Sequence, residues 1–161
     1  MYIITNEILK FSTNIRTIVK DHATGKVYID DWGSNTVVNN GKYSILDRLI
    51  NYGNTNEGVL TYGAVGTGST PVAITDTDLE TELARVGVSS GKYRSGLFSY
   101  LRAYFSVGVA TGTLTEFAWF GGGVDGNASG VADSGTMYNR IIIDKTITAT
   151  QSITVEQKWG L

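Results

Sequence analysis

The sequence predicts a mainly β protein, an antiparallel β-sandwich of jelly-roll-like or barrel-like form that carries two short helices. Three observations predict this fold class. The chain is rich in β-branched residues, tyrosine and glycine, its side chains alternate with a period of two through much of the second half, and helix signals are confined to two short stretches. A length of 161 residues fits a single domain. We expect residues 35–161 to form the sandwich core, and residues 1–34 to form a β-hairpin or strand extension available for assembly.

Short β-prone runs separated by a turn characterise residues 1–34. The runs read MYIITNEIL, NIRTIVK and KVYIDDW, and the turn-like segment DHATGK (Asp21–Lys26) connects the second run to the third. This spacing predicts a β-hairpin. The first run is a candidate strand for pairing with the edge of another sheet, and Tyr2 and Ile4 are its candidate interface residues.

The segment NTVVNNGKYSILDRLINYG changes to the period of a helix. Four apolar residues fall on one helical face: Ile45, Leu46, Leu49 and Ile50. Asn39 or Asn40 can cap the start of this helix, and Gly53 can end it. The pattern predicts a first amphipathic helix.

A second short helix is predicted over Thr75–Val86, which reads TDTDLETELARV. Thr75 with Asp78 three residues later fits a capping box, and the acidic residues fall where the helix dipole favours them. Leu79 and Leu83 form its apolar stripe. We expect this helix to cover one face or one end of the sandwich, with the two leucines as its anchors.

A period of two returns after this stretch. The runs LFSYLRAYFSVGV and TLTEFAWF are separated by ATG, which predicts a hairpin, and a glycine-rich stretch over residues 121–135 leads to the strands TMYNRIIIDK and SITVEQKW. The tyrosine-rich face of the first run can pack inside the protein, bury against a partner subunit or stack on sugars. Four residues of these strands are candidate interface residues: Tyr100, Arg102, Tyr104 and Trp119.

The composition argues against several classes of function. A net charge of -2 and a pI near 5.3, without a basic cluster, argue against nucleic-acid binding, which needs a basic face. The absence of cysteine excludes disulfides, thiolate metal sites and cysteine nucleophiles. No apolar run is long enough to span a membrane, and polar residues interrupt the N-terminal run where a signal peptide would be continuously apolar. We expect no nucleic-acid or membrane partner.

Residues that could support catalysis are few. His22 is the only histidine and falls in a polar turn, so any serine–histidine arrangement depends on it. Two acidic pairs are more typical of solvated or capping groups than of glycosidase carboxylates: Asp30 with Asp31, and Asp76 with Asp78. Glu116 lies in an aromatic strand, where Arg102 or Arg140 is its expected structural partner. We predict a protein that is not an enzyme, with no catalytic residues, cofactor or metal site.

The order of elements from Asn35 to the C-terminus resembles that of a family of small tailed-phage virion proteins of the tail-fibre or tail-associated type. The resemblance rests on a glycine-rich strand end that leads through proline to a short acidic helix (YGAVGTGSTP, then TDLETELAR), on GTLTE at the start of a strand (Gly112–Glu116), and on the NR pair before a β-run (Asn139 and Arg140). It implies a non-catalytic β-sandwich that assembles with copies of itself and docks on other virion proteins.

The leading hypothesis is therefore a structural virion protein of the tail, neck or fibre base, assembled in the host cytoplasm and present as a homo-oligomer. Two alternatives remain open. One is a capsid (head) decoration protein, and the other is a carbohydrate- or receptor-binding module that recognises a host glycan through its aromatic side chains.

Overall fold

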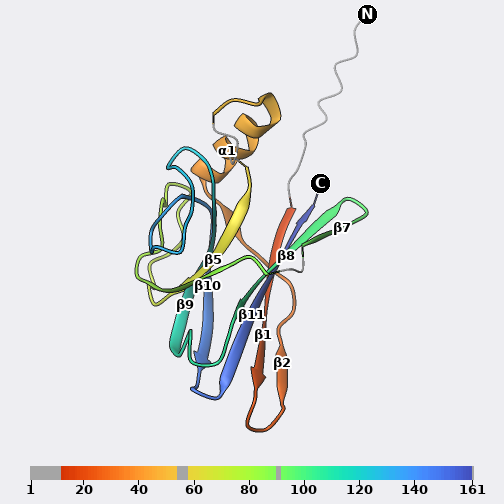
Figure 1. Cartoon of the computed structure of the whole chain (residues 1–161), viewed down its shortest axis with the longest axis vertical. Coiled ribbons are helices and arrows are strands. Elements are labelled where there is room, and N and C mark those ends of the chain that lie inside the picture. Colours follow the sequence, from red (N-terminus) through yellow and green to blue (C-terminus); the bar gives the residue numbers. More distant parts are fainter. Residues whose placement is uncertain (1–11, 54–57, 90–91, 161) are drawn as a thin grey trace, which may run out of the picture.

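The computed structural model describes residues 12–53, 58–89 and 92–160. In these residues the chain forms two antiparallel β-sheets and one α-helix (Figure 1), so the predicted mainly β class is confirmed. The predicted first strand, with Tyr2 and Ile4, lies outside the described residues.

The first sheet contains six strands: β1 (Ser12–Asp21), β2 (Val27–Ile29), β3 (Gly33–Ser34), β7 (Tyr93–Ser95), β8 (Phe98–Phe105) and β11 (Gln151–Gly160). Their order is β2-β1-β11-β8-β7, and β3 also pairs with β1. β1 pairs with β11 along its whole length, from Ser12 opposite Gly160 to Asp21 opposite Gln151. The hairpin predicted through Asp21–Lys26 is confirmed, since β1 and β2 pair on either side of this turn.

The second sheet contains five strands: β4 (Thr36–Val37), β5 (Leu60–Gly66), β6 (Glu82–Gly87), β9 (Gly112–Gly121) and β10 (Thr136–Ile147). Their order is β4-β10-β9-β5-β6. The glycine-rich stretch between β9 and β10 connects two paired strands of this sheet. Figure 1 shows it beside the loop that joins β5 to β6, on the side of the second sheet that faces away from the first.

The hairpin predicted between β8 and β9 is not formed, because the two strands lie in different sheets. β8 pairs with β7 and β11, whereas β9 pairs with β5 and β10. Phe105 at the end of β8 and Leu114 near the start of β9 are both fully buried in the same core. The ATG turn therefore carries the chain from one sheet to the other, and each strand then pairs with partners that are distant in sequence.

Side chains from both sheets form the main core between them, which gives the molecule its sandwich-like architecture. The first sheet contributes Ile15, Ala103, Phe105, Ile153 and Val155, and the second contributes Val65, Leu114, Phe117, Trp119 and Ile143. A smaller core lies on the opposite face of the second sheet and contains Val38, Ala64, Leu79, Ala118, Phe120 and Met137. Burial of each large apolar side chain contributes about 1.5–3 kcal/mol. The second sheet is thus buried on both faces.

The helix α1 (Asn39–Ile50) confirms the first predicted helix, but three of the four residues of its predicted apolar face point outward. Its predicted ends are wrong, since Val38 is the N-cap, without a side-chain hydrogen bond, and Asn51 is the C-cap. Its buried residues are Gly41 and Ser44. A Cβ atom on Gly41 would lie 2.3 Å from the carbonyl oxygen of Tyr138 in β10, so only glycine fits this crossing. Three large side chains point to the surface and are 58%, 70% and 74% exposed: Leu46, Leu49 and Ile50. The helix packs through its smallest side chains.

The prediction of a second helix over Thr75–Val86 is wrong. Residues 75–81 form turns and loop, and the rest of the stretch begins the strand β6. Tertiary hydrogen bonds outcompete the local capping signals, since the backbone N–H groups of Glu80 and Thr81 donate to the carboxylate of Glu116 on β9. An N–H group held in this way cannot donate to a helical carbonyl.

The loop nevertheless performs part of the covering role expected of a helix. Leu79 is 6% exposed and packs in the smaller core on the second sheet. Leu83, the second expected anchor, is 48% exposed on the edge strand β6, so its expected burial is wrong. Thr75 is exposed and Asp78 is half-buried. Leu79 lies in the loop before β6 and Leu83 lies on the strand, so the helical spacing that would place both leucines on one face does not apply here.

Candidate functional site

Glu116 on β9 lies at the centre of a buried polar cluster. Its side chain is 0% exposed, and its two oxygens accept three backbone N–H groups of the β5–β6 loop, from Gly68, Glu80 and Thr81, at 2.9, 3.1 and 2.9 Å. The Nε atom of Arg140 donates to the same carboxylate over 2.9 Å. Of the two predicted partners of Glu116, Arg140 is confirmed and Arg102 is wrong, because Arg102 binds Glu156.

Arg140 extends this cluster to the loop surface. Its Nη1 atom lies 2.9 Å from Oδ2 of Asp76. Desolvation lowers the pKa of Arg140, but hydrogen bonds to Asp76 and Glu116 outweigh this effect and raise the pKa above its ordinary value. The arginine therefore remains charged, and both carboxylates are engaged in holding the loop. The cluster is suited to fixing the backbone rather than to proton transfer.

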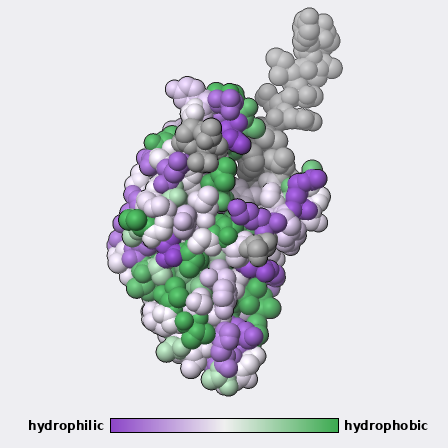
Figure 2. Space-filling view, viewed as in Figure 1, coloured by the Kyte–Doolittle hydropathy of each residue, from purple (hydrophilic) through white to green (hydrophobic). Residues whose placement is uncertain are grey.

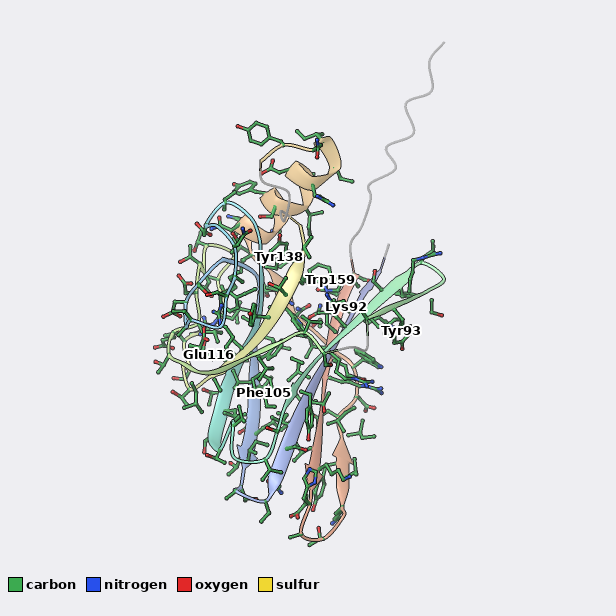
Figure 3. The ribbon with its side chains drawn as sticks, viewed as in Figure 1. Lys92, Tyr93, Phe105, Glu116, Tyr138 and Trp159 are labelled. Carbon is green, nitrogen blue, oxygen red and sulfur yellow. The ribbon has the colours of Figure 1, made fainter. Side chains whose placement is uncertain are left out.

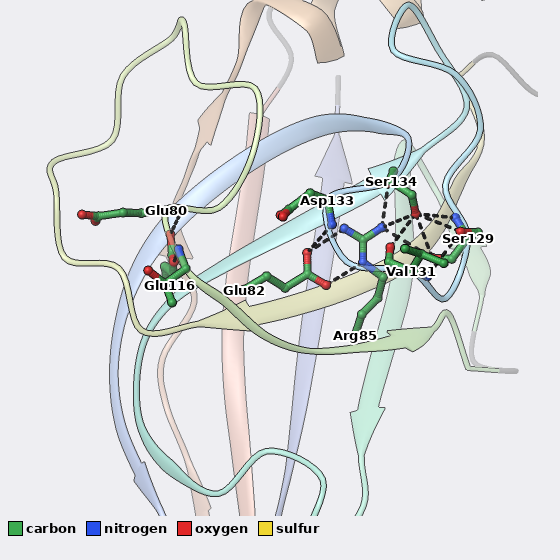
Figure 4. A network of polar contacts seen from close by, with 9 residues as sticks. Glu80, Glu82, Arg85, Glu116, Ser129, Val131, Asp133 and Ser134 are labelled. Carbon is green, nitrogen blue, oxygen red and sulfur yellow. Dashed lines mark hydrogen bonds and ion pairs between the residues drawn. The ribbon is translucent and has the colours of Figure 1, made fainter.

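A second buried ion pair attaches the glycine-rich stretch between β9 and β10 to β6. Nη2 of Arg85 lies 2.7 Å from Oε2 of Glu82, and the two side chains are 2% and 3% exposed. Arg85 also donates to the carbonyl oxygen of Ser134 over 2.7 Å (Figure 4). Its guanidinium carbon lies 4.1 Å from the centroid of the Phe120 ring. Such desolvated, multiply bonded arginines fix the segments they join.

The outer face of the first sheet carries a charged and aromatic cluster. Glu156 on β11 accepts hydrogen bonds from Arg16 on β1 and Arg102 on β8. The guanidinium of Arg16 lies 4.6 Å from the ring centroid of Trp32, and Trp32 meets Tyr100 edge to face with centroids 6.4 Å apart. A cavity of about 260 Å³ opens between these side chains. This arrangement combines aromatic surfaces with charged hydrogen-bond donors.

Glu156 is ionised in this cluster. Burial raises its pKa, but the hydrogen bonds from Arg16 and Arg102 outweigh burial, and the net pKa lies below the ordinary value. The carboxylate thus neutralises one of the two neighbouring arginines, and the cluster keeps a net positive charge.

A larger groove of about 530 Å³ opens between α1 and the ends of β5, β8 and β11. Its apolar lining comes from Ile45, Val59, Leu60, Leu101 and Trp159. Figure 3 labels Lys92, Tyr93, Tyr138 and Trp159, which also border it. The indole Nε1–H of Trp159 is buried and has no hydrogen-bond partner among the described residues.

The predicted interface residues separate into two groups. Tyr100 and Arg102 lie together on the outer face of the first sheet, with Tyr104 44% exposed on the same strand. Trp119 does not belong with them, because it is fully buried in the main core, where it meets Phe117 edge to face with ring centroids 5.2 Å apart. β9 has one face in the main core and the other in the smaller core, so both faces of this strand are covered. The prediction that Trp119 is an interface residue required an exposed face, which β9 does not have at this position.

Outside these clusters, the single histidine of the chain makes a hydrogen bond to a serine. Nε2 of His22 lies 2.9 Å from Oγ of Ser152, but within the described ranges no carboxylate bonds to this imidazole, and Asp21 accepts backbone N–H groups of its own turn instead. A serine–histidine nucleophile needs an orienting third group. Among the described residues no group of three or more acidic or histidine side chains could hold a metal ion, and no helix there could cross a membrane.

Three participants in the two surface features escape prediction from sequence: Trp32, Glu156 and Trp159. Trp32 follows a short strand in a polar stretch, and it joins the cluster only because β3 turns it back over β1. Glu156 carries the one available signal, a charged residue in the middle of an apolar strand, because such residues in sheets usually have a cross-strand partner.

The described residues thus form a two-sheet β protein with a groove beside α1, a cavity beside Trp32 and buried ion pairs that hold the β5–β6 loop and the glycine-rich stretch. Comparisons with protein-family models, with curated proteins and with solved structures find no significant match.

Proposed function

We propose that this protein is a non-catalytic structural component of a tailed-phage virion, at the tail, neck or fibre base, where it binds copies of itself and other virion proteins. The observation that carries the proposal is the outward apolar face of α1, formed by Leu46, Leu49 and Ile50. A helix on a monomer's surface normally turns such residues toward its own core, so an exposed stripe indicates a protein–protein contact.

The surface around α1 fits a protein partner. Tyr43 and Tyr52, at either end of the stripe, are 53% and 69% exposed. Figure 2 shows apolar residues (green) beside hydrophilic ones (purple) at the α1 end of the molecule. Interfaces combine an apolar and aromatic centre with a polar rim, and tyrosine is enriched in them. The resemblance in element order to small virion proteins supports a phage particle as the place where these contacts form.

Mass spectrometry of purified phage particles tests the proposal. Peptides of this chain should remain with the particles through a density gradient and should be present in several copies per particle, as the oligomeric role requires. Loss of the chain from washed particles would contradict it. Recovery with isolated heads but not with isolated tails would favour the alternative of a capsid decoration protein.

A carbohydrate-binding role is the second candidate, and the cavity beside Trp32 favours it. Trp32 and Tyr100 provide aromatic surface, and Arg16 and Arg102 provide donors to sugar hydroxyl or carboxylate groups. A glycan array should then show hits that Trp32→Ala removes. An array without hits would remove the support that this cavity gives.

A further inference from the structure

The outer face of the first sheet gathers three cations around one carboxylate. Arg16 on β1 and Arg102 on β8 lie opposite Glu156 on β11 from its two sides. Lys158 lies two residues further along β11, and its ammonium is 5.6 Å from the ring centroid of Trp32. The side chains of Arg16 and Arg102 are 32% and 46% exposed, so their ion pairs contribute little to stability. The excess positive charge beside the cavity favours a bound anion.

The two arginines keep hydrogen-bond donors that Glu156 does not use. Arg16 donates through Nε to one oxygen of Glu156, and Arg102 donates through Nε and Nη2 to the other. Within the described residues, neither Nη atom of Arg16 nor Nη1 of Arg102 has a hydrogen-bond acceptor. Both arginines line the cavity, where Glu156 is the only carboxylate among the described lining residues. The complement of this lining is a group that only accepts hydrogen bonds, such as a carboxylate.

Aromatic rings form the other walls of the cavity. Tyr93 on β7 stacks on Tyr100, with ring centroids 4.6 Å apart and an angle of 7° between the ring planes. Trp32 meets Tyr100 at 67°, so the rings make a corner. Aromatic corners of this kind can pack against the apolar face of a sugar ring. Pockets for drug-sized ligands measure roughly 300–1,000 Å³. The cavity of about 260 Å³ therefore suits one sugar residue rather than a chain of them.

We infer that the cavity beside Trp32 binds a single sugar residue that carries a carboxylate, with the carboxylate on Arg16 and Arg102 and the sugar ring against the aromatic corner. The planar fork of a guanidinium matches a carboxylate, whereas the hydroxyl groups of a neutral sugar leave the excess positive charge uncompensated. The inference rests on the proposed carbohydrate-binding role, the second candidate function, and it does not depend on the virion role.

Nuclear magnetic resonance titration of the ¹⁵N-labelled full chain tests this inference. The chain has three tryptophans, and loss of one indole N–H signal in Trp32→Phe assigns the reporter. Trp119, fully buried in the main core, provides a reference signal that should not move. Glucuronate and N-acetylneuraminate are the acidic probes, glucose is the neutral sugar and acetate is the free carboxylate. At least one acidic sugar should shift the Trp32 signal saturably, with an affinity at least about tenfold above those of glucose and acetate.

A matched pair of variants assigns the binding to the cavity. Arg102→Gln should weaken the affinity for the acidic sugar at least about tenfold, because it removes a charged donor. Lys20→Gln removes the same charge from an exposed position on β1 outside the cavity, and it should leave the affinity unchanged. If Arg102→Gln lowers the melting temperature, Tyr93→Ala on the exposed edge strand replaces it and should weaken binding several-fold. Equal affinities in the cavity variant and Lys20→Gln would overturn the assignment.

The probes also separate the possible failures. Equal affinities for glucuronate and glucose would overturn the preference for a carboxylate and leave the carbohydrate-binding role in place. Equal affinities for the acidic sugars and acetate would overturn the part given to the sugar ring. A Trp32 signal that moves with none of the probes would overturn the inference and remove the support that this cavity gives to carbohydrate binding.

Discussion

At the scale of single residues, Glu116 is the side chain on which the β5–β6 loop depends. It is fully buried, and it holds Arg140 and three loop N–H groups. Glu116→Gln removes one of the two counter-charges that lie 2.9 Å from the buried arginine, and removal of one partner of a buried pair costs about 3–5 kcal/mol. We expect a loss of that size in urea unfolding. Asp144→Asn removes the same charge from an exposed position on β10 and should change stability little; equal losses would contradict the assigned role of Glu116.

Glu156 should give the protein a measurable acid sensitivity. Its folded-state pKa is depressed, so its pairing with Arg16 and Arg102 stabilises the fold above the ordinary carboxyl pKa, and this stability is lost as the pH falls through the lowered value. Thermal melts from pH 7 down to pH values well below 4.5, the ordinary pKa of a glutamate side chain, should show a steeper decline in stability for the unmodified chain than for Glu156→Gln. Parallel curves would show that the pair does not couple to folding.

At the scale of elements, the packing of α1 against β10 depends on Gly41 rather than on the leucines of the helix. Alanine is favoured over glycine in helices by about 1 kcal/mol, yet a Cβ on Gly41 would overlap the backbone of Tyr138. Overpacking typically costs about 1–3 kcal/mol, so Gly41→Ala should destabilise the protein. Lys42→Ala, at the exposed neighbouring position, should be neutral or slightly stabilising in the same melts. A stabilised Gly41→Ala would mean that α1 does not pack on β10 in this way.

The outward face of α1 should matter for association and not for folding. Leu49 is 70% exposed, so Leu49→Asp is expected to change the free energy of unfolding by less than about 0.5 kcal/mol. The same substitution places a charge in the proposed contact, and it should weaken the oligomer in light scattering over a concentration series. An oligomer of unchanged mass and affinity would remove α1 from the interface.

The two predicted helices show where sequence reasoning succeeds and where it fails. The pattern of Asn39–Ile50 gives the correct element because its helical period is local. The apolar face of this helix was expected to be buried but is exposed, because exposed leucines and buried leucines give the same sequence period. Thr75–Val86 carries equally good capping signals, but Glu116, distant in sequence, takes its N–H groups. Local patterns report propensity, and tertiary partners decide between competing conformations.

At the scale of the whole molecule, the β class follows from alternation, whereas the pairing does not. β1 pairs with β11, so Arg16 meets Glu156 across the two ends of the chain. Nothing in the local sequence specifies that partner, which is also why the cluster around Trp32 and the groove beside Trp159 could not be predicted. The period of two correctly placed Tyr100 and Arg102 on one face of the same strand, because that relation is local.

The central claim, a structural role in a phage particle, is tested most directly by immunogold electron microscopy with antibodies raised against the purified chain. We predict gold at the neck, tail or fibre base of intact particles. Gold confined to the head would establish decoration instead, and particles without label under conditions that label a known tail protein would contradict a structural role in the virion.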